Sequence, residues 1–215
     1  MGTFPGISKN KGLVELSFGN IPVWKGVQKI AGVQKCLPMR LSANQSPIVQ
    51  CESLQVINDM VITYEADDYM FITPPPGSSI WANSLGESRL KVVEEVIDGG
   101  VLPRNILEIG AGSTWIANKL QEKYNPDSYV ITDPAIKETS GRIEIIREYF
   151  PSKKTLDRRF DLIIGFSVLE HVPDPVLFLA NIKKHLTSNG MVILVYPDCE
   201  TQMLRGDINV LIHEH

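Results

Sequence analysis

The stretch that decides the fold is Asn105-Ile-Leu-Glu-Ile-Gly-Ala-Gly-Ser113. It opens with a short apolar run typical of a buried strand, and Gly110 and Gly112 follow directly. Glycine accepts backbone conformations that other residues avoid, so this pair lets the chain turn sharply and approach a ligand closely. A helical pattern begins at Thr114. The stretch therefore predicts a strand, a tight turn and a helix whose free N–H groups face the turn.

The alternation of strands and helices continues along the chain. Further strands are predicted from apolar runs at residues 129–133, 142–146, 160–165 and 191–196. One helix is expected from Ser84, which begins a capping-box pattern with Glu87. Another is expected after Asp174-Pro175 and before Asn189-Gly190. This order predicts an α/β fold: a Rossmann-like, doubly wound, mostly parallel sheet, whose ligands bind beyond the carboxyl ends of the strands.

The first part of the chain has a different composition. Residues 1–83 are rich in Pro, Gly and Ser, with short β-type runs at 48–51 and 60–64. The run Pro74-Pro75-Pro76 predicts a loop or linker, because three prolines exclude both a helix and a central strand. We therefore expect a small β-rich N-terminal region at 1–83 and an α/β domain at 84–215.

Composition excludes several classes of protein. The chain has 215 residues, of which 43% are hydrophobic and 21% charged, as in ordinary globular domains. Its net charge of −4 provides no broad basic surface for nucleic acid, and no apolar run approaches the roughly 20 residues that span a bilayer. The three cysteines form no paired pattern, so we expect neither a disulfide framework nor a metal site. The expected location is the cytoplasm, and the expected partner is a small molecule.

Asp133 and Pro134 follow the second predicted strand, where a carboxylate can accept hydrogen bonds from a ribose diol. Both a nicotinamide dinucleotide and S-adenosylmethionine carry such a ribose. The dinucleotide fingerprint needs a third glycine at position 115, but this chain has Trp115. Glu108 suits the positive sulfonium of S-adenosylmethionine, which we therefore favour. A nicotinamide oxidoreductase, or an ordinary turn that binds no ligand, are the alternatives.

Longer segments support this choice. The sequence resembles the class I S-adenosylmethionine-dependent methyltransferases in the order and spacing of successive motifs over roughly residues 86–198. These motifs lie at 108–113, 129–133, 160–175 and 189–197. One departure is Thr114, where that family often has a further glycine.

The resemblance implies particular roles for the matching residues. The glycine turn would lie against the methionine and ribose parts of the cofactor, and Asp133 would hold the ribose hydroxyls. Tyr149, with Phe150 beside it, would flank the adenine, while Phe166 and Ser167 would close the site. Together, the residues assigned to the cofactor are Glu108, Gly110, Ala111, Gly112, Ser113, Asp133, Pro134, Tyr149, Phe166 and Ser167.

A narrower resemblance is to the sugar C-methyltransferases. It is carried by landmarks at residues 37–41, 49–55, 68–71 and 212–215. That family has an N-terminal zinc module with Cys-x-x-Cys pairs, and a Tyr-His-Glu-His string after the fifth strand to which the role of base is assigned. Here only Cys36 and Cys51 precede residue 83, without any histidine, and Ile212 takes the tyrosine position. Zinc is therefore not expected, since a structural site needs four ligands.

These likenesses predict a methyltransferase that acts on a small molecule, with a sugar or nucleotide sugar as the narrower expectation. If a proton must leave the acceptor, a histidine is the natural base, because imidazole titrates near neutrality. The candidate bases are His171, His213 and His215. Structural roles for all three remain open, as does an inactive or truncated domain that lacks the last strands of the sheet.

Overall fold

The structure, a computed structural model, divides into two compact units. One comprises residues 63–196, and the other comprises residues 1–62 together with 197–215. The described residues are 14–22, 36–45, 52–57 and 75–206, without 101, 139, 140, 156 and 173. The predicted boundary between residues 83 and 84 stays a prediction.

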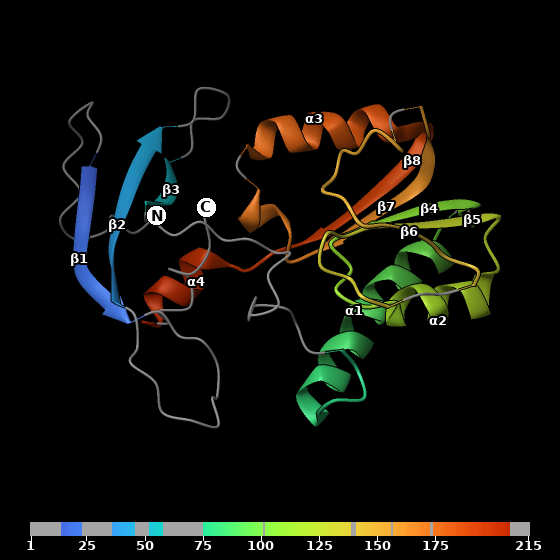
Figure 1. The fold of residues 1–215 in the computed structure, drawn as a ribbon, viewed down its shortest axis with the longest axis horizontal. Helices are drawn as coiled ribbons and strands as arrows, with labels where there is room; N and C mark the ends of the chain where they lie inside the picture. Colours follow the sequence, from blue (N-terminus) through green and yellow to red (C-terminus); the bar gives the residue numbers. More distant parts are fainter. Residues whose placement is uncertain are drawn as a thin grey trace. The chain divides into compact units, whose positions relative to one another are not determined.

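The larger unit contains a parallel sheet of five strands in the order β6-β5-β4-β7-β8 (Figure 1). Its strands are β4 (Asn105–Ile109), β5 (Ser128–Thr132), β6 (Glu144–Ile146), β7 (Phe160–Phe166) and β8 (Leu186–Val195). The chain builds outward from β4 to β6 and then crosses back to β7 on the other side of β4. The predicted Rossmann-like, mostly parallel sheet is confirmed. Its strand order reverses beside β4, which is where such sheets bind ligands.

Helices cover both faces of this sheet. Helices α1 (Ile80–Asp98) and α2 (Trp115–Tyr124) lie on one face, and α3 (Pro175–His185) lies on the other (Figure 1). Alternate residues of β7 enter the two cores: Ile164 packs with Leu120 of α2, whereas Ile163 packs with Phe178 of α3. Burial on both faces explains why β7 is a nearly continuous apolar run. Among the described residues, no helix is long and apolar enough to cross a membrane.

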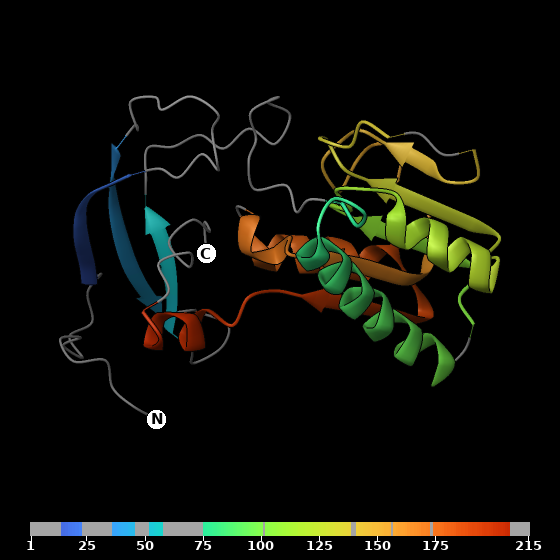
Figure 2. The same cartoon turned by 90° about the horizontal axis from the view of Figure 1, so that it is seen from below.

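The smaller unit contains an antiparallel sheet in the order β1-β2-β3 (Figure 2). Its elements are β1 (Val14–Pro22), β2 (Cys36–Gln45), β3 (Glu52–Ile57) and the short helix α4 (Cys199–Leu204). These strands agree with a β-rich N-terminal region. The predicted β-type runs at 48–51 and 60–64 lie outside the described residues.

Helix α1 begins one turn earlier than the sequence pattern predicted. Ser79 is its N-cap, and the Ser79 hydroxyl accepts a hydrogen bond from the Ala82 N–H at 3.0 Å. Ser84 lies inside the helix, where its carbonyl accepts a hydrogen bond from the Ser88 hydroxyl. The predicted start at Ser84 was wrong because several serines stand near this end, and the helix is capped by Ser79.

Helix α3 begins as predicted but ends earlier. Asp174 caps it by accepting a hydrogen bond from the Leu177 N–H at 2.9 Å, and Pro175 occupies the first turn. The helix ends at His185, so the predicted end at Asn189-Gly190 was wrong. Gly190 belongs to β8, at an irregularity in the pairing with β7, where an added Cβ would lie 2.9 Å from the Phe160 carbonyl oxygen.

We predict that Gly190→Ala lowers the free energy of unfolding by about 1–3 kcal/mol, the usual cost of forcing an extra methyl group into a packed site. The nearest atoms include the Phe160 carbonyl oxygen, which belongs to the backbone and cannot rotate away. Urea unfolding measures the effect. Gly141→Ala is the matched control, because an added Cβ there meets nothing within 4 Å. Equal stability of the two variants would contradict the close packing at Gly190.

Candidate functional site

The turn after β4 is built from glycines in the left-handed region. Gly110 has φ +64° and Gly112 has φ +67°. A Cβ at Gly110 would lie 2.6 Å from Cγ2 of Val168, so this position also lacks room for a side chain. The Gly110 N–H donates to the Thr132 carbonyl at 2.8 Å, which ties the turn to the end of β5. The predicted tight turn between β4 and α2 is therefore present. At Gly110 and Gly112 no side chain covers its backbone.

Asp133 holds this turn in place. Its side chain is 5% exposed, and its Oδ2 accepts a hydrogen bond from the Gly112 N–H at 2.7 Å. Its Oδ1 accepts hydrogen bonds from the N–H groups of Ala135 at 2.7 Å and Ile136 at 3.1 Å. Each carboxylate oxygen has two lone-pair sites, so Oδ2 can accept a second bond. The structure thus places Asp133 beside the glycine turn, as predicted, while its binding to a ribose stays a prediction.

A carboxylate also occupies the N-terminus of α2. The N–H and the hydroxyl of Thr114 both donate to Oε2 of Glu138, each at 2.6 Å. A dinucleotide pyrophosphate would need this same helix end, where free N–H groups attract anions. Glu138 therefore argues against the nicotinamide alternative. Glu138 was not predicted as a site residue, because it stands 24 residues from Thr114 and no local motif connects the two.

Glu108 lies beneath the turn, in the interior. It is 2% exposed, and its Oε2 accepts a hydrogen bond from the Tyr129 hydroxyl at 2.7 Å. Burial raises the pKa of Glu108 to about 7, with Asp133 adding to the rise, while the Tyr129 hydrogen bond and Arg89 oppose it. Near neutral pH the Glu108 carboxyl therefore carries only part of a negative charge. Tyr129 was not predicted as its partner.

Arg89 of α1 is a site residue that sequence analysis missed. Its Nη2 donates to the Ser167 hydroxyl at 2.9 Å, and its guanidinium carbon lies 5.4 Å from the centre of the Phe166 ring. The structure thus brings the predicted pair Phe166 and Ser167 together around one cation. The only signal in the sequence was the helical pattern of α1, which does not distinguish Arg89 from other polar residues of that helix.

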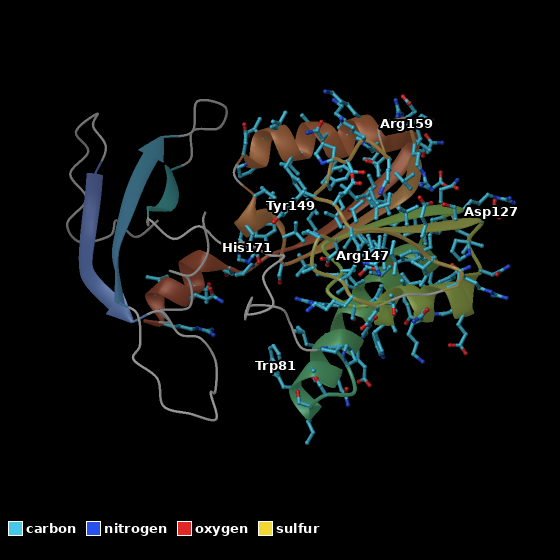
Figure 3. All side chains as sticks on the ribbon, in the orientation of Figure 1. Trp81, Asp127, Arg147, Tyr149, Arg159 and His171 are labelled. Atoms are coloured by element: carbon cyan, nitrogen blue, oxygen red, sulfur yellow. The ribbon has the colours of Figure 1, made fainter. Side chains whose placement is uncertain are left out.

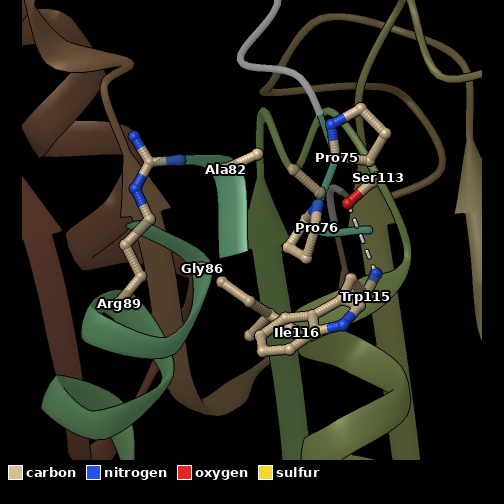
Figure 4. Close-up of a pocket in the computed structure, with 9 residues that line it drawn as sticks. Pro75, Pro76, Ala82, Gly86, Arg89, Ser113, Trp115 and Ile116 are labelled. Carbon is tan, nitrogen blue, oxygen red and sulfur yellow. Dashed lines mark hydrogen bonds between the residues drawn. The ribbon is translucent and has the colours of Figure 1, made fainter. Parts of the chain in front are cut away.

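A small pocket lies between α1, the glycine turn and the start of α2 (Figure 4). Its volume is about 30 Å³, and its lining residues are Pro75, Pro76, Ala82, Gly86, Arg89, Ala111, Ser113, Trp115 and Ile116. Such a volume holds about two water molecules, whereas pockets for small molecules usually measure about 300–1,000 Å³. We call the Pro75–Pro76 segment the proline strap. It packs closely on α1, since a Cβ at Gly86 would lie 2.5 Å from Cγ of Pro76.

Other predicted site residues lie on neighbouring segments (Figure 3). Tyr149, after β6, is 50% exposed, while Phe150 packs edge-on against Phe178 on the α3 face. His171 ends a short 3₁₀ helix, Leu169–His171, and its N–H donates to the Val168 carbonyl. The described residues place neither Tyr149 nor His171 in the lining of the small pocket.

The remaining candidates cannot be placed. His213 and His215 lie outside the described residues, as do Ile212, Cys51 and the landmark at 68–71. Among the residues that the structure does describe, no group of three or more His, Cys, Asp or Glu side chains could hold a metal ion.

Comparison with known proteins identifies the family. A family model described as a methyltransferase domain matches residues 83–214. The chain belongs to this family. The predicted methyltransferase domain of the S-adenosylmethionine type is thereby confirmed, while the sugar C-methyltransferase subtype stays a prediction. Comparison with curated proteins gave no match.

Solved methyltransferase structures are similar to this chain only distantly. The plantazolicin methyltransferase BpumL, in complex with a triazolic desmethylPZN analog and SAH, is 12% identical, with a TM-score of 0.47 over 59% of this chain and 50% of that one. Coclaurine N-methyltransferase bound to N-methylheliamine and SAH is 13% identical, with a TM-score of 0.45. The match covers 57% of this chain and 38% of that one. A chain from the complex of the Haloferax volcanii Trm112 methyltransferase activator with the putative methyltransferase is 13% identical, with a TM-score of 0.46. The match covers 57% of this chain and 62% of that one.

This chain spans about half the length of BpumL, the first of these methyltransferases.

We predict that loss of the Glu108 proton makes the domain less stable as pH rises. The folded-state pKa of about 7 exceeds the ordinary value of 4.5, so between these values the folded protein binds more protons than the unfolded chain. This group's contribution to stability is present below pH 4.5 and falls by about 3 kcal/mol as pH passes 7. Glu108→Gln keeps an acceptor for Tyr129 and removes the charge. Urea unfolding between pH 5 and pH 8 should show a flatter profile for this variant.

The control for this prediction is Glu122→Gln, which removes one carboxyl group from the exposed side of α2. Its pH profile should follow that of the original chain. If Glu108→Gln also kept the original slope, the raised pKa of Glu108 would be refuted.

Proposed function

We propose that this chain is an S-adenosylmethionine-dependent methyltransferase that binds its cofactor at the carboxyl ends of β4, β5 and β7. One observation carries the proposal: two left-handed glycines, Gly110 and Gly112, join β4 to α2, and the buried carboxylate of Asp133 at the end of β5 holds Gly112. This turn presents main chain instead of side chains to a ligand. The family match over residues 83–214 supports the same function.

The residues at this edge suit that cofactor better than a dinucleotide. Gly110 and Gly112 allow close approach of the ligand, and Oδ2 of Asp133 has capacity to accept a bond from a ribose hydroxyl. Glu138 already caps the helix end that a pyrophosphate would use. When bound, S-adenosylmethionine supplies an activated methyl group, so the chain's task is to position the acceptor in line with it.

The size of the pocket sets a condition on binding. A cavity of about 30 Å³ cannot hold an adenosyl group, and the proline strap forms part of its wall. A ligand that entered this pocket would have to displace the strap from Gly86. The competing function is an inactive domain that keeps the fold without turnover.

The acceptor is proposed as a small molecule, with a sugar or nucleotide sugar as the narrower proposal that rests on the sequence resemblance. Tyr149 would flank the adenine, and Phe166 and Ser167 would close the site. His171 is the proposed base among the described residues, and His213 and His215 are proposed alongside it. General-base catalysis of this kind contributes about 10²–10⁴-fold to a rate.

Calorimetric titration with S-adenosylhomocysteine, S-adenosylmethionine and NAD tests the cofactor. We expect both adenosyl compounds to bind and NAD not to bind. A screen of sugar and other small-molecule acceptors, read out as formation of S-adenosylhomocysteine, then tests turnover. Binding without turnover on any acceptor would favour the inactive domain, and NAD binding would overturn the assignment.

We predict that Asp133→Asn weakens binding of S-adenosylhomocysteine at least about tenfold. The substitution removes a charged acceptor, and hydrogen bonds to charged groups contribute about 1.5–3 kcal/mol. Calorimetry measures the affinity, and thermal unfolding checks that the variant remains folded, because Asp133 also holds Gly112. Asp157→Asn, at an exposed loop position, is the control. An unchanged affinity in folded Asp133→Asn would remove Asp133 from the site.

A further inference from the structure

Helix α3 buries one of its sides against the parallel sheet. Phe178, Ile182 and His185 recur at positions i, i+4 and i+7, and all three are buried. Among the described residues of the larger unit, α3 is the only α-helix on its face of the sheet (Figure 1). The side of α3 that points away from these three residues therefore has no neighbouring α-helix within that part of the unit.

This outer side of α3 is largely apolar. Val176 is 54% exposed, Leu177 is 55% exposed and Leu179 is 43% exposed, and Ala180 is exposed as well. A surface helix normally carries polar side chains on its outer side, whereas a helix that is apolar on all sides is covered by other protein. The outer side of α3 thus has the composition of a contact surface.

The two ends of this outer side carry opposite charges. Asp174 caps the helix and is exposed; its Oδ1 accepts the Leu177 N–H, and its Oδ2 can accept a further bond. Lys183 and Lys184 lie in the last turn and are exposed. A second copy of α3 in the antiparallel direction would meet the opposite charge at both ends. Its helix dipole would also run in the favourable direction.

Ala180 lies where two such helices would cross. It is the middle residue of α3, which runs from residue 175 to residue 185. A small side chain at the crossing point lets two helices pack closely. A two-fold axis beside Ala180 would place the last turn of one copy against the first turn of the other. The stems of the lysines would then cover the apolar side chains of that first turn, and their ammonium groups would reach Asp174.

We propose that the outer side of α3 binds the same side of a second copy of this chain, antiparallel, about a two-fold axis beside Ala180. Such an interface uses one surface patch twice. The helix has 11 residues and is roughly 16 Å long, so the contact is smaller than the roughly 1,200 Å² of a standard interface. The dimer therefore exchanges with the monomer. The inference is independent of the proposed function, because it uses none of the residues assigned to the cofactor.

Sedimentation equilibrium of the full chain, at concentrations up to about 1 mM, measures this association. We expect an equilibrium between monomer and dimer. Ala180→Glu should weaken it at least about tenfold, because two carboxylates would oppose each other at the axis. Glutamate is a good helix former, so this exposed position should tolerate it in the monomer. Ser84→Glu adds the same charge at an exposed position of α1 and should leave the association unchanged.

Cross-linking tests the geometry of the interface. Ala180→Cys should give a disulfide-linked dimer under mild oxidation, because a residue beside a two-fold axis lies close to its own copy. Ser84→Cys is the matched control, and it should give no more linked dimer than the original chain with its three natural cysteines. If Ala180→Glu failed to fold, as judged by circular dichroism, Ala180→Cys would decide alone.

Two results would overturn the proposal. One is an original chain that stays monomeric up to about 1 mM, in which case something other than a second copy covers α3. The other is a dimer that folded Ala180→Glu leaves intact and that Ala180→Cys does not link, since the interface would then lie elsewhere. Failure to bind S-adenosylhomocysteine would overturn the proposed function and leave this inference standing.

Discussion

The carboxylate of Asp133 is the group on which the rest of this site depends. It accepts three backbone N–H bonds, from Gly112 on one side and from Ala135 and Ile136 on the other. A turn made largely of glycine has few side chains to pack, so its shape must come from hydrogen bonds. Three donors also compensate the burial of a charged group, which would otherwise be costly. The same interaction thus fixes the turn and keeps an acidic group at the strand ends.

Several acidic side chains lie close together at this edge of the sheet, and their charges act on one another. Asp133 contributes to the raised pKa of Glu108, and Glu138 adds a further carboxylate at the N-terminus of α2. Burial is the main reason that the pKa of Glu108 is raised to about 7, and the negative charge of Asp133 adds to the rise. A surface already occupied by carboxylates suits a ligand with positive charge better than one with a pyrophosphate.

The sequence predicted those parts of the molecule that short-range patterns determine. The strand Phe160–Phe166 was recognisable because it is buried on both faces and therefore continuously apolar. The glycine turn and Asp133 were recognisable because they stand directly after strands. The start of α1 was not recognisable, because Ser79 and Ser84 are equivalent as caps in sequence. The end of α3 was not recognisable either, because Asn189-Gly190 is as typical of a helix end as of an irregular strand.

The missed site residues share one property: their partners are distant in the chain. Arg89 and Ser167 are separated by 78 residues, and Glu108 and Tyr129 by 21. No local pattern encodes these contacts, because they arise only when the sheet assembles and brings α1 beside the end of β7. Helix periodicity identified which face of α1 is buried, but it could not show that a charged residue at the edge of that face meets a hydroxyl.

Arg89 is half-buried beside the small pocket, where burial and its acidic neighbours act on its charge in opposite directions. Burial lowers the pKa of Arg89, which means that the surroundings disfavour its charge, and electrostatic attraction to Glu170 and Glu108 opposes this effect. Pro76 packs against Gly86 at the same pocket, so the proline strap limits the volume available beside Arg89.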